Sequence, residues 1–284
     1  MSWILSLMLT LASAKGLVTR VGGCKTRKEA QSVLIYKQWH LPPTTVTKGF
    51  KEKYPQEKNQ TSIYITLADK VKSKKVDLVL AEGCEGEIDE NFSTTFNGWD
   101  YKSLKAESHK RSYQRVLTHV PLKLEARFGA GLKTLCGDSD KLILEGNHRM
   151  SNLRGWMGYW IRLTEKTLDE EKRNPFREAA AEQLKMDKSS PVSTLLPEIQ
   201  KKLREELEGF NRSLAERDDQ FVKILQESQF KTAAIVIGGL HVKDLMKKLE
   251  AAGFACDLYE PRGYSREDES LIQDFQRALG ANPI

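Results

Sequence analysis

Two histidines stand where they could do chemistry, because each follows a short apolar run that predicts a β-strand. His40 comes a few residues after the run at 33–36, and His241 comes after the run at 233–237, behind two glycines. The carboxyl ends of parallel strands share one edge of a sheet, so we expect both imidazoles at the same rim. An imidazole titrates near neutral pH and also binds metal ions. Taken singly, each histidine is more typical of a structural hydrogen-bonding residue, whereas the pair predicts a site.

Acidic residues are predicted to lie beside these histidines. Glu82 follows the apolar run at 76–80, Asp138 follows the run at 132–136, and Glu216 lies on a predicted helix shortly before the fourth run. Imidazole and carboxylate together suit a divalent transition ion such as Mn²⁺, Fe²⁺, Co²⁺ or Zn²⁺. Such an ion would lower the pKa of a bound water molecule and polarise a carbonyl group. The alternative for the stretch that begins with Glu216 is a solvated cluster of charges on a helix.

Several common catalytic motifs are missing from the sequence. There is no His-Glu-x-x-His pair, which excludes zincin-type proteases, and there is neither a P-loop nor a Gly-x-Ser-x-Gly nucleophile elbow. The segment Gly129-Ala130-Gly131 lacks the third glycine of a dinucleotide-binding fingerprint. The histidines and acids therefore remain the best candidates for chemistry.

Five apolar runs separated by helical patterns predict the elements that position these residues. The runs cover 33–36, 76–80, 132–136, 233–237 and 255–259. Strands that alternate with helices indicate an α/β fold with a mainly parallel central sheet flanked by helices. The long stretch between the third and fourth strands, about 140–230, predicts an α-helical insertion. We expect one domain over 15–284.

Apolar spacing predicts the helices of the second half of the chain. After the fourth strand, apolar residues recur at helical spacing over 242–249, and Gly253 is expected to end that helix. Within the insertion, one set of apolar residues predicts an amphipathic helix and a second set predicts its successor. The first set is Leu196, Ile199, Leu203 and Leu207, and the second is Leu214, Phe221 and Leu225.

The first residues predict export from the cytoplasm. Residues 1–14 are apolar and uncharged, and they end in Ala12-Ser13-Ala14, a pattern of the kind that signal peptidase cuts. We therefore expect a signal peptide over 1–14 and a secreted or periplasmic product. A membrane span is not expected, because Lys15 and Arg20 interrupt the apolar run before it reaches about 20 residues.

The net charge and the cysteine spacing exclude some classes of binding partner and of metal or redox site. The net charge of +6 comes from interleaved acidic and basic residues, and no nucleic-acid-binding motif accompanies it, so we expect no nucleic-acid partner. The four cysteines, at 24, 84, 136 and 256, include no Cys-x-x-Cys pair, which disfavours zinc ribbons and thioredoxin-like motifs. In an oxidising compartment they can form disulfides. Three pairings are open, and the spacing does not choose between them.

In this combination of motifs the chain resembles the TraB/PrgY and Tiki superfamily, which is related to ChaN-like and erythromycin-esterase-like proteins. Gly238 to His241 match its late Gly-x-x-His motif, and Glu216-Arg217-Asp218 match its Glu-Arg-Asn/Asp helix. Leu80-Ala81-Glu82 match the acidic strand end. The early Gly-x-x-His motif departs from the pattern, since Lys37 stands where glycine is expected before His40.

The resemblance implies an exported metal-dependent hydrolase, with peptidases and esterase-like enzymes among its relatives. It implies that His40, Glu82 and His241 bind a divalent metal, Mn, Co or Zn, or act as acid and base. It gives Glu216 and Arg217 a place in the catalytic site, with Arg217 orienting a carboxylate or stabilising an oxyanion. The substrate would be a peptide or a small molecule.

Two alternatives stay open. The first is a non-catalytic haem- or metal-binding protein of the ChaN-like type, which the lysine at position 37 slightly favours. The second is an interaction protein that keeps the fold and has lost activity.

Overall fold

The structure, a computed structural model, describes residues 16–24, 31–39, 55–94, 99–100, 102 and 119–280. Within these residues the chain has an α/β fold on a six-stranded sheet with the order β1-β8-β2-β7-β3-β6. The strands are β1 (Val18–Gly23), β2 (Ser32–Gln38), β3 (Leu78–Ala81), β6 (Lys133–Cys136), β7 (Thr232–Gly238) and β8 (Ala255–Pro261). The strands from β8 to β6 pair in parallel, and β1 pairs antiparallel with β8. The predicted mainly parallel sheet is therefore confirmed.

The edge strand β1 was not predicted from the sequence. Most of its residues are exposed, so it lacks the continuous apolar run that marks a buried parallel strand. Its place is held by contacts with β8, including the ion pair between Arg20 and Asp257 at 2.7 Å. Pairing with a neighbour, rather than its own composition, makes this segment a strand.

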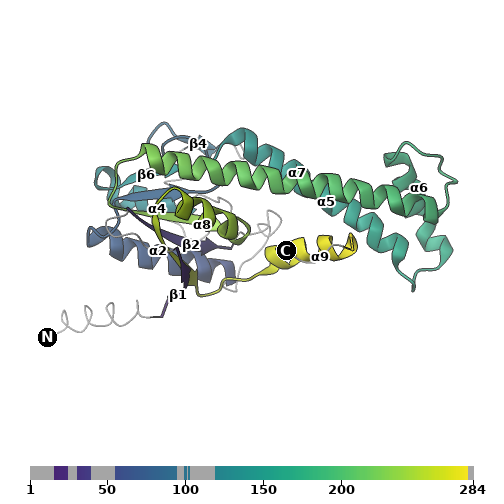
Figure 1. The fold of residues 1–284 in the computed structure, drawn as a ribbon, viewed down its shortest axis with the longest axis horizontal. Coiled ribbons are helices and arrows are strands. Elements are labelled where there is room, and N and C mark those ends of the chain that lie inside the picture. The colour runs from purple at the N-terminus through teal and green to yellow at the C-terminus, as the bar shows by residue number, and fades with distance from the viewer. Residues whose placement is uncertain are drawn as a thin grey trace. The chain divides into compact units, whose positions relative to one another are not determined.

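Helices cover both faces of the sheet (Figure 1). One face packs against α8 (Val242–Ala251) and the last turns of α7 (Val192–Glu227), and the other packs against α2 (Pro55–Lys72) and α4 (His119–Phe128). Neighbouring residues of a strand point to opposite faces, so both faces of these central strands must be apolar. The first core includes Val33, Ile35, Leu80, Ile235, Phe221 and Leu245. The second includes Leu34, Tyr36, Val79, Val236, Leu67 and Leu124.

The chain between β6 and β7 is helical, as the sequence predicts, and it forms three helices. They are α5 (Asp140–Thr164), α6 (Glu170–Gln183) and α7. The chain forms two compact units, one of residues 1–143 and 215–266 and one of residues 144–214 and 267–284, the latter with α9 (Glu267–Ala278). Within the second unit, Glu206 of α7 accepts hydrogen bonds from Arg149 at 3.0 Å and Asn152 at 3.1 Å, both on α5.

The helix α7 is one continuous helix of 36 residues, where the sequence predicts two. The break was expected between Leu207 and Leu214, but the apolar face continues through this gap with the buried Phe210. Gly209 is the one glycine of the segment, and a single glycine weakens a helix by about 1 kcal/mol without ending it. A Cβ at Gly209 would lie 2.8 Å from the Arg149 guanidinium, so the glycine makes room for that side chain.

Two disulfides decide the cysteine pairing that the spacing left open. Cys24–Cys256 joins the end of β1 to β8, and Cys84–Cys136 joins the loop after β3 to the last residue of β6. Disulfides persist mainly in oxidising compartments. Both bonds therefore fit the predicted setting outside the cytoplasm.

Residues 1–14, the predicted signal peptide, lie outside the described residues, and so does His40. Among the helices that the structure describes, none is both long enough and apolar enough to cross a membrane. After β3, the short strands β4 (Ser93–Thr94) and β5 (Trp99–Asp100) pair as a two-stranded sheet.

Candidate active site

The ends of three neighbouring strands bring charged side chains together at one edge of the sheet. Ala81 of β3 is in register with Cys136 of β6 and with Val236 of β7, so the residues that follow these strands emerge side by side. Helix α7 adds two more residues from one face of the sheet. We call this group the charge cluster. It consists of Glu82, Asp138, Arg217, Asp218 and His241. All five side chains are buried.

Arg217 holds two carboxylates at once. Its Nε donates to both oxygens of Asp138, at 3.0 and 2.9 Å, and its Nη2 donates to Asp138 Oδ2 at 2.6 Å and to Glu82 Oε1 at 3.0 Å. Forked pairing of this kind is the strongest contact between a guanidinium and a carboxylate. Burial opposes the charge of Arg217, but Glu82 and Asp138 outweigh it and raise its pKa further above the ordinary value.

Glu82 links the arginine to the histidine. Its Oε2 accepts a hydrogen bond from the backbone N–H of Gly238 at 2.5 Å, which fastens the end of β3 to the end of β7. Its Oε1, which already accepts from Arg217, lies 3.3 Å from His241 Nε2. One carboxylate therefore faces two cationic groups and a backbone donor.

His241 lies between two carboxylates on the turn that joins β7 to α8. Its Nδ1 donates to Asp218 Oδ1 at 2.7 Å, while Nε2 faces Glu82. Burial and the charge of Arg217 oppose protonation, but Glu82 and Asp218 outweigh them, and the pKa of His241 rises from 6.5 to about 9. Burial also raises the pKa of Asp218 above 3.8, against the opposing effect of His241.

The proton on this histidine is explained by the charge count of the cluster. Three carboxylates and one guanidinium would carry a net charge of −2 around a neutral imidazole, and protonation reduces this to −1. A buried site resists unbalanced charge, because little water is present to solvate it. The Asp218–His241 pair therefore keeps a proton at neutral pH and can donate it from a water-poor position.

As arranged, the described residues do not fit a metal ion. Both ring nitrogens of His241 face carboxylates, and the Glu82 oxygen nearest the ring already accepts from Arg217. A metal between Glu82 and His241 would have to displace the guanidinium from that oxygen. Over the ranges that the structure covers, no group of three or more His, Cys, Asp or Glu side chains is placed to hold a metal. The chemistry is therefore derived from the side chains alone.

The structure brings together three of the predicted site residues and separates one. Glu82, Arg217 and His241 meet in the charge cluster, whereas Glu216 is exposed on α7. Adjacent residues on a helix point about 100° apart, so Arg217 faces the sheet and Glu216 faces solvent. The predicted partner His40 lies outside the described residues, which reach Trp39 at the end of β2.

Two members of the cluster were given no role in the predicted site. Asp138 was expected beside the histidines because it closely follows β6, but its contact with Arg217 was not foreseen. Asp218 occurs in the matched helix motif, and only the fold shows that it, rather than Glu216, contacts His241. Lys37, which replaces the expected glycine, is buried with its Nζ 3.6 Å from Glu260 Oε2.

Gly137 is required for the close approach of α7 that brings in Arg217. A Cβ at Gly137 would overlap the ring of Phe221, which is fully buried one helical turn after Arg217. We expect Gly137→Ala to lower the free energy of unfolding by about 1–3 kcal/mol, because the overpacked ring has no space to retreat into. Chemical denaturation measures this change.

The matched control for this substitution is Gly131→Ala, at the other end of β6. Gly131 is exposed, and a Cβ there would meet nothing within 4 Å. We expect this variant to stay within about 0.5 kcal/mol of the wild type. Equal effects of the two substitutions would contradict the packing argument.

Comparison with other proteins adds no relative to this picture. No protein-family model, no curated protein and no solved structure matches the chain.

Proposed function

We propose that this chain is an exported hydrolase in which the Asp218–His241 pair is the proton-donating group. The observation that carries the proposal is a buried imidazole held between Asp218 at 2.7 Å and Glu82 at 3.3 Å. Acid–base catalysts are commonly held by a carboxylate that fixes the ring and its tautomer. A strongly shifted pKa in a specific carboxylate setting is also typical of functional sites.

In this proposal His241 acts as an acid. A protonated imidazole can donate from Nε2 to a leaving group, or stabilise the negative charge that develops on a carbonyl oxygen, once that group takes the place of Glu82 Oε1, which lies 3.3 Å from Nε2. Arg217 pairs with Glu82 and Asp138, and its positive charge weakens the hold of Glu82 on the proton. The base that activates water is assigned to His40, which the sequence places after β2. The described end of β2 supports this assignment, because Gln38 is in register with Gly238.

The substrate class proposed is a peptide or an ester, as the sequence resemblance implies. Export is proposed with it and is supported by the two disulfides. Recovery of active protein from a reducing cytoplasm with four free thiols would contradict the export part.

The test is turnover of a panel of peptides and esters by the wild type and by His241→Gln. Glutamine keeps a polar side chain of similar length but cannot carry the proton, so we expect kcat to fall roughly 100-fold or more. Glu216→Gln is the matched control, because Glu216 is exposed on the same helix as Arg217. We expect it to keep wild-type kcat. Turnover that survives in His241→Gln would show that the assigned site is wrong.

Metal analysis and haem addition on the same preparations distinguish the acid–base hydrolase from a metal-dependent hydrolase and from a non-catalytic binding protein. If the wild type holds stoichiometric Mn, Co or Zn and a His40→Ala, His241→Ala double variant has lost it, a metal-dependent hydrolase replaces the acid–base hydrolase as the explanation. A Soret band after addition of haem, without turnover of any panel member, would favour the non-catalytic binder.

A further inference from the structure

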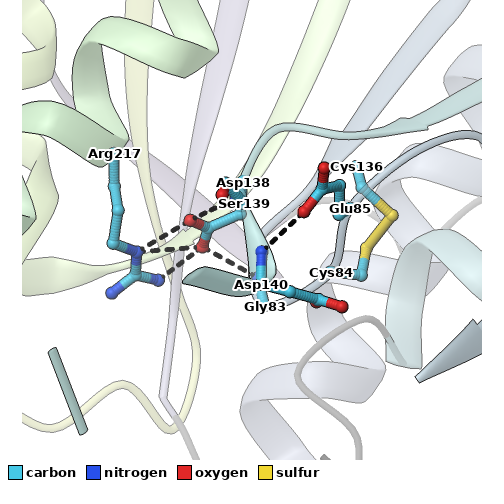
Figure 2. The surroundings of a disulfide bond; sticks show 8 residues. All are labelled: Gly83, Cys84, Glu85, Cys136, Asp138, Ser139, Asp140 and Arg217. Carbon is cyan, nitrogen blue, oxygen red and sulfur yellow. Dashed lines mark hydrogen bonds and ion pairs between the residues drawn. A yellow bond between two sulfur atoms is a disulfide. The ribbon is translucent and has the colours of Figure 1, made fainter. Parts of the chain in front are cut away.

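The disulfide Cys84–Cys136 is close in the sequence to both carboxylates that Arg217 pairs with, Glu82 and Asp138, and Figure 2 draws it together with Asp138 and Arg217. Cys84 comes two residues after Glu82, and Cys136 comes two residues before Asp138. Both sulfurs are buried in a small apolar cluster with Ala81, Ile88, Phe92 and Leu122. The covalent bond therefore spans the same two chain segments that Arg217 spans by ion pairs.

Hydrogen bonds between the same two segments leave little freedom around the disulfide. Gly137 N–H donates to the Ala81 carbonyl at 2.8 Å, and Gly83 N–H donates to Asp138 Oδ2 at 3.2 Å. Farther along, Asp140 N–H donates to Glu85 Oε2 at 2.9 Å, as Figure 2 shows. Glu82 and Asp138 thus lie on two loops that hydrogen bonds and the disulfide hold together.

One of the two strands below these loops, β6, is the last strand of the sheet and pairs with β3 over four residues. On its other side β6 meets the loop after β3, where Glu87 bridges Leu135 and the Cys136 N–H donates to the Gly86 carbonyl at 2.8 Å. This edge of the sheet is therefore held by the same loop that carries Cys84. Glu82 and Asp138 also carry like charges, so they favour separation wherever the loops permit it.

We propose that Cys84–Cys136 is a positioning element of the active site, which keeps Glu82 and Asp138 close enough for one guanidinium to pair with both. Its catalytic meaning rests on the proposed function, whereas its effect on Arg217 does not. The disulfide Cys24–Cys256 is the natural comparison, because it joins β1 to β8 at the other edge of the sheet.

The test compares Cys84→Ala/Cys136→Ala with Cys24→Ala/Cys256→Ala in the full chain. The readout is hydrogen exchange of the Arg217 Nε–H, measured by NMR, because this proton is donated to Asp138. We expect exchange to become roughly tenfold faster or more in the first variant and to stay within about twofold of wild type in the second. Equal exchange in the two folded variants would overturn the proposal.

Reduction of a single bond covers the case in which the first variant does not fold. In the Cys24→Ala/Cys256→Ala background, a phosphine reductant opens Cys84–Cys136 alone, and the same sample is measured before and after. Faster exchange at Arg217 with the far-UV circular dichroism retained supports the proposal. Complete unfolding on reduction would overturn it, because the bond would then hold the whole domain rather than the site.

The same samples distinguish the two proposals. If wild type hydrolyses no member of the substrate panel but Arg217 responds as expected, the proposed function fails and the positioning role stands. If turnover falls in Cys84→Ala/Cys136→Ala while Arg217 exchange is unchanged, the positioning role fails and the proposed function stands.

Discussion

Arg217→Ala is expected to lower the free energy of unfolding by about 3–5 kcal/mol, because it leaves Glu82 and Asp138 buried without their cation. Most of this cost is the desolvation of two carboxylates that lose their partner, rather than the value of the ion pair itself. The measurement is denaturant unfolding near neutral pH. The effect should shrink at low pH, where protonation removes the unpaired charges.

Two further variants control this result. Arg162→Ala removes an arginine of α5 whose side chain is 50% exposed and pairs with Glu165, just beyond the end of that helix, so we expect a change below about 1 kcal/mol. Arg217→Lys keeps the charge but loses the forked geometry, so its cost should fall between those of the two alanine variants. A cost below about 1 kcal/mol for Arg217→Ala would mean that water reaches these carboxylates freely.

The pH dependence of stability is expected to follow the proton on His241. The folded-state pKa of about 9 lies above the ordinary 6.5, so the folded state binds this proton more tightly than the unfolded state does. The contribution is fully present below pH 6.5 and is lost as the pH rises through about 9. The difference of about 2.5 pH units, at about 1.4 kcal/mol each, corresponds to about 3 kcal/mol.

Asp218 adds a trend of the same sign at lower pH. Its folded-state pKa is raised above 3.8 by burial, so stability also declines as the pH rises above that value. Unfolding of wild type and His241→Gln should be compared from pH 6 to pH 10. We expect the decline between about pH 6.5 and 9 in wild type and its loss in the variant. Parallel profiles would show that His241 does not hold the proton.

These two experiments also bear on activity. In the proposed function kcat requires the protonated His241, so turnover should decline as the pH rises through about 9. A base such as His40 must be unprotonated to act, so it would also make turnover decline at lower pH. The structural and catalytic roles of the proton can thus be compared on one pH scale.

Much of the fold could be predicted from the sequence, because local composition reports on burial. A buried parallel strand must be apolar on both faces, and five such runs marked β2, β3, β6, β7 and β8. Helical spacing located α8, and Gly253, with φ of +88°, ends it as expected. Continuity of α7 and the edge strand β1 were missed, since both depend on packing against distant residues.

Part of the site could also be predicted, because its residues follow strands that the sequence marks. The place of Glu82 and of His241 after parallel strands could be inferred from the chain, and the structure brings both to one rim. His241 is buried there, but it faces carboxylates rather than apolar side chains. The predicted metal and the role of His40 stay predictions, which metal analysis of the wild type and of the His40→Ala, His241→Ala double variant tests.

By itself the sequence determined the five buried strands, their order along the chain, and the acids and histidine that follow them. Only the tertiary structure decided which cysteines pair, that Arg217 rather than Glu216 faces the sheet, and that Asp218 holds His241. Strand and helix formation depends on neighbours along the chain, which a sequence displays directly. Pairing of charges and sulfurs depends on distances between segments up to 237 residues apart, and these exist only after folding.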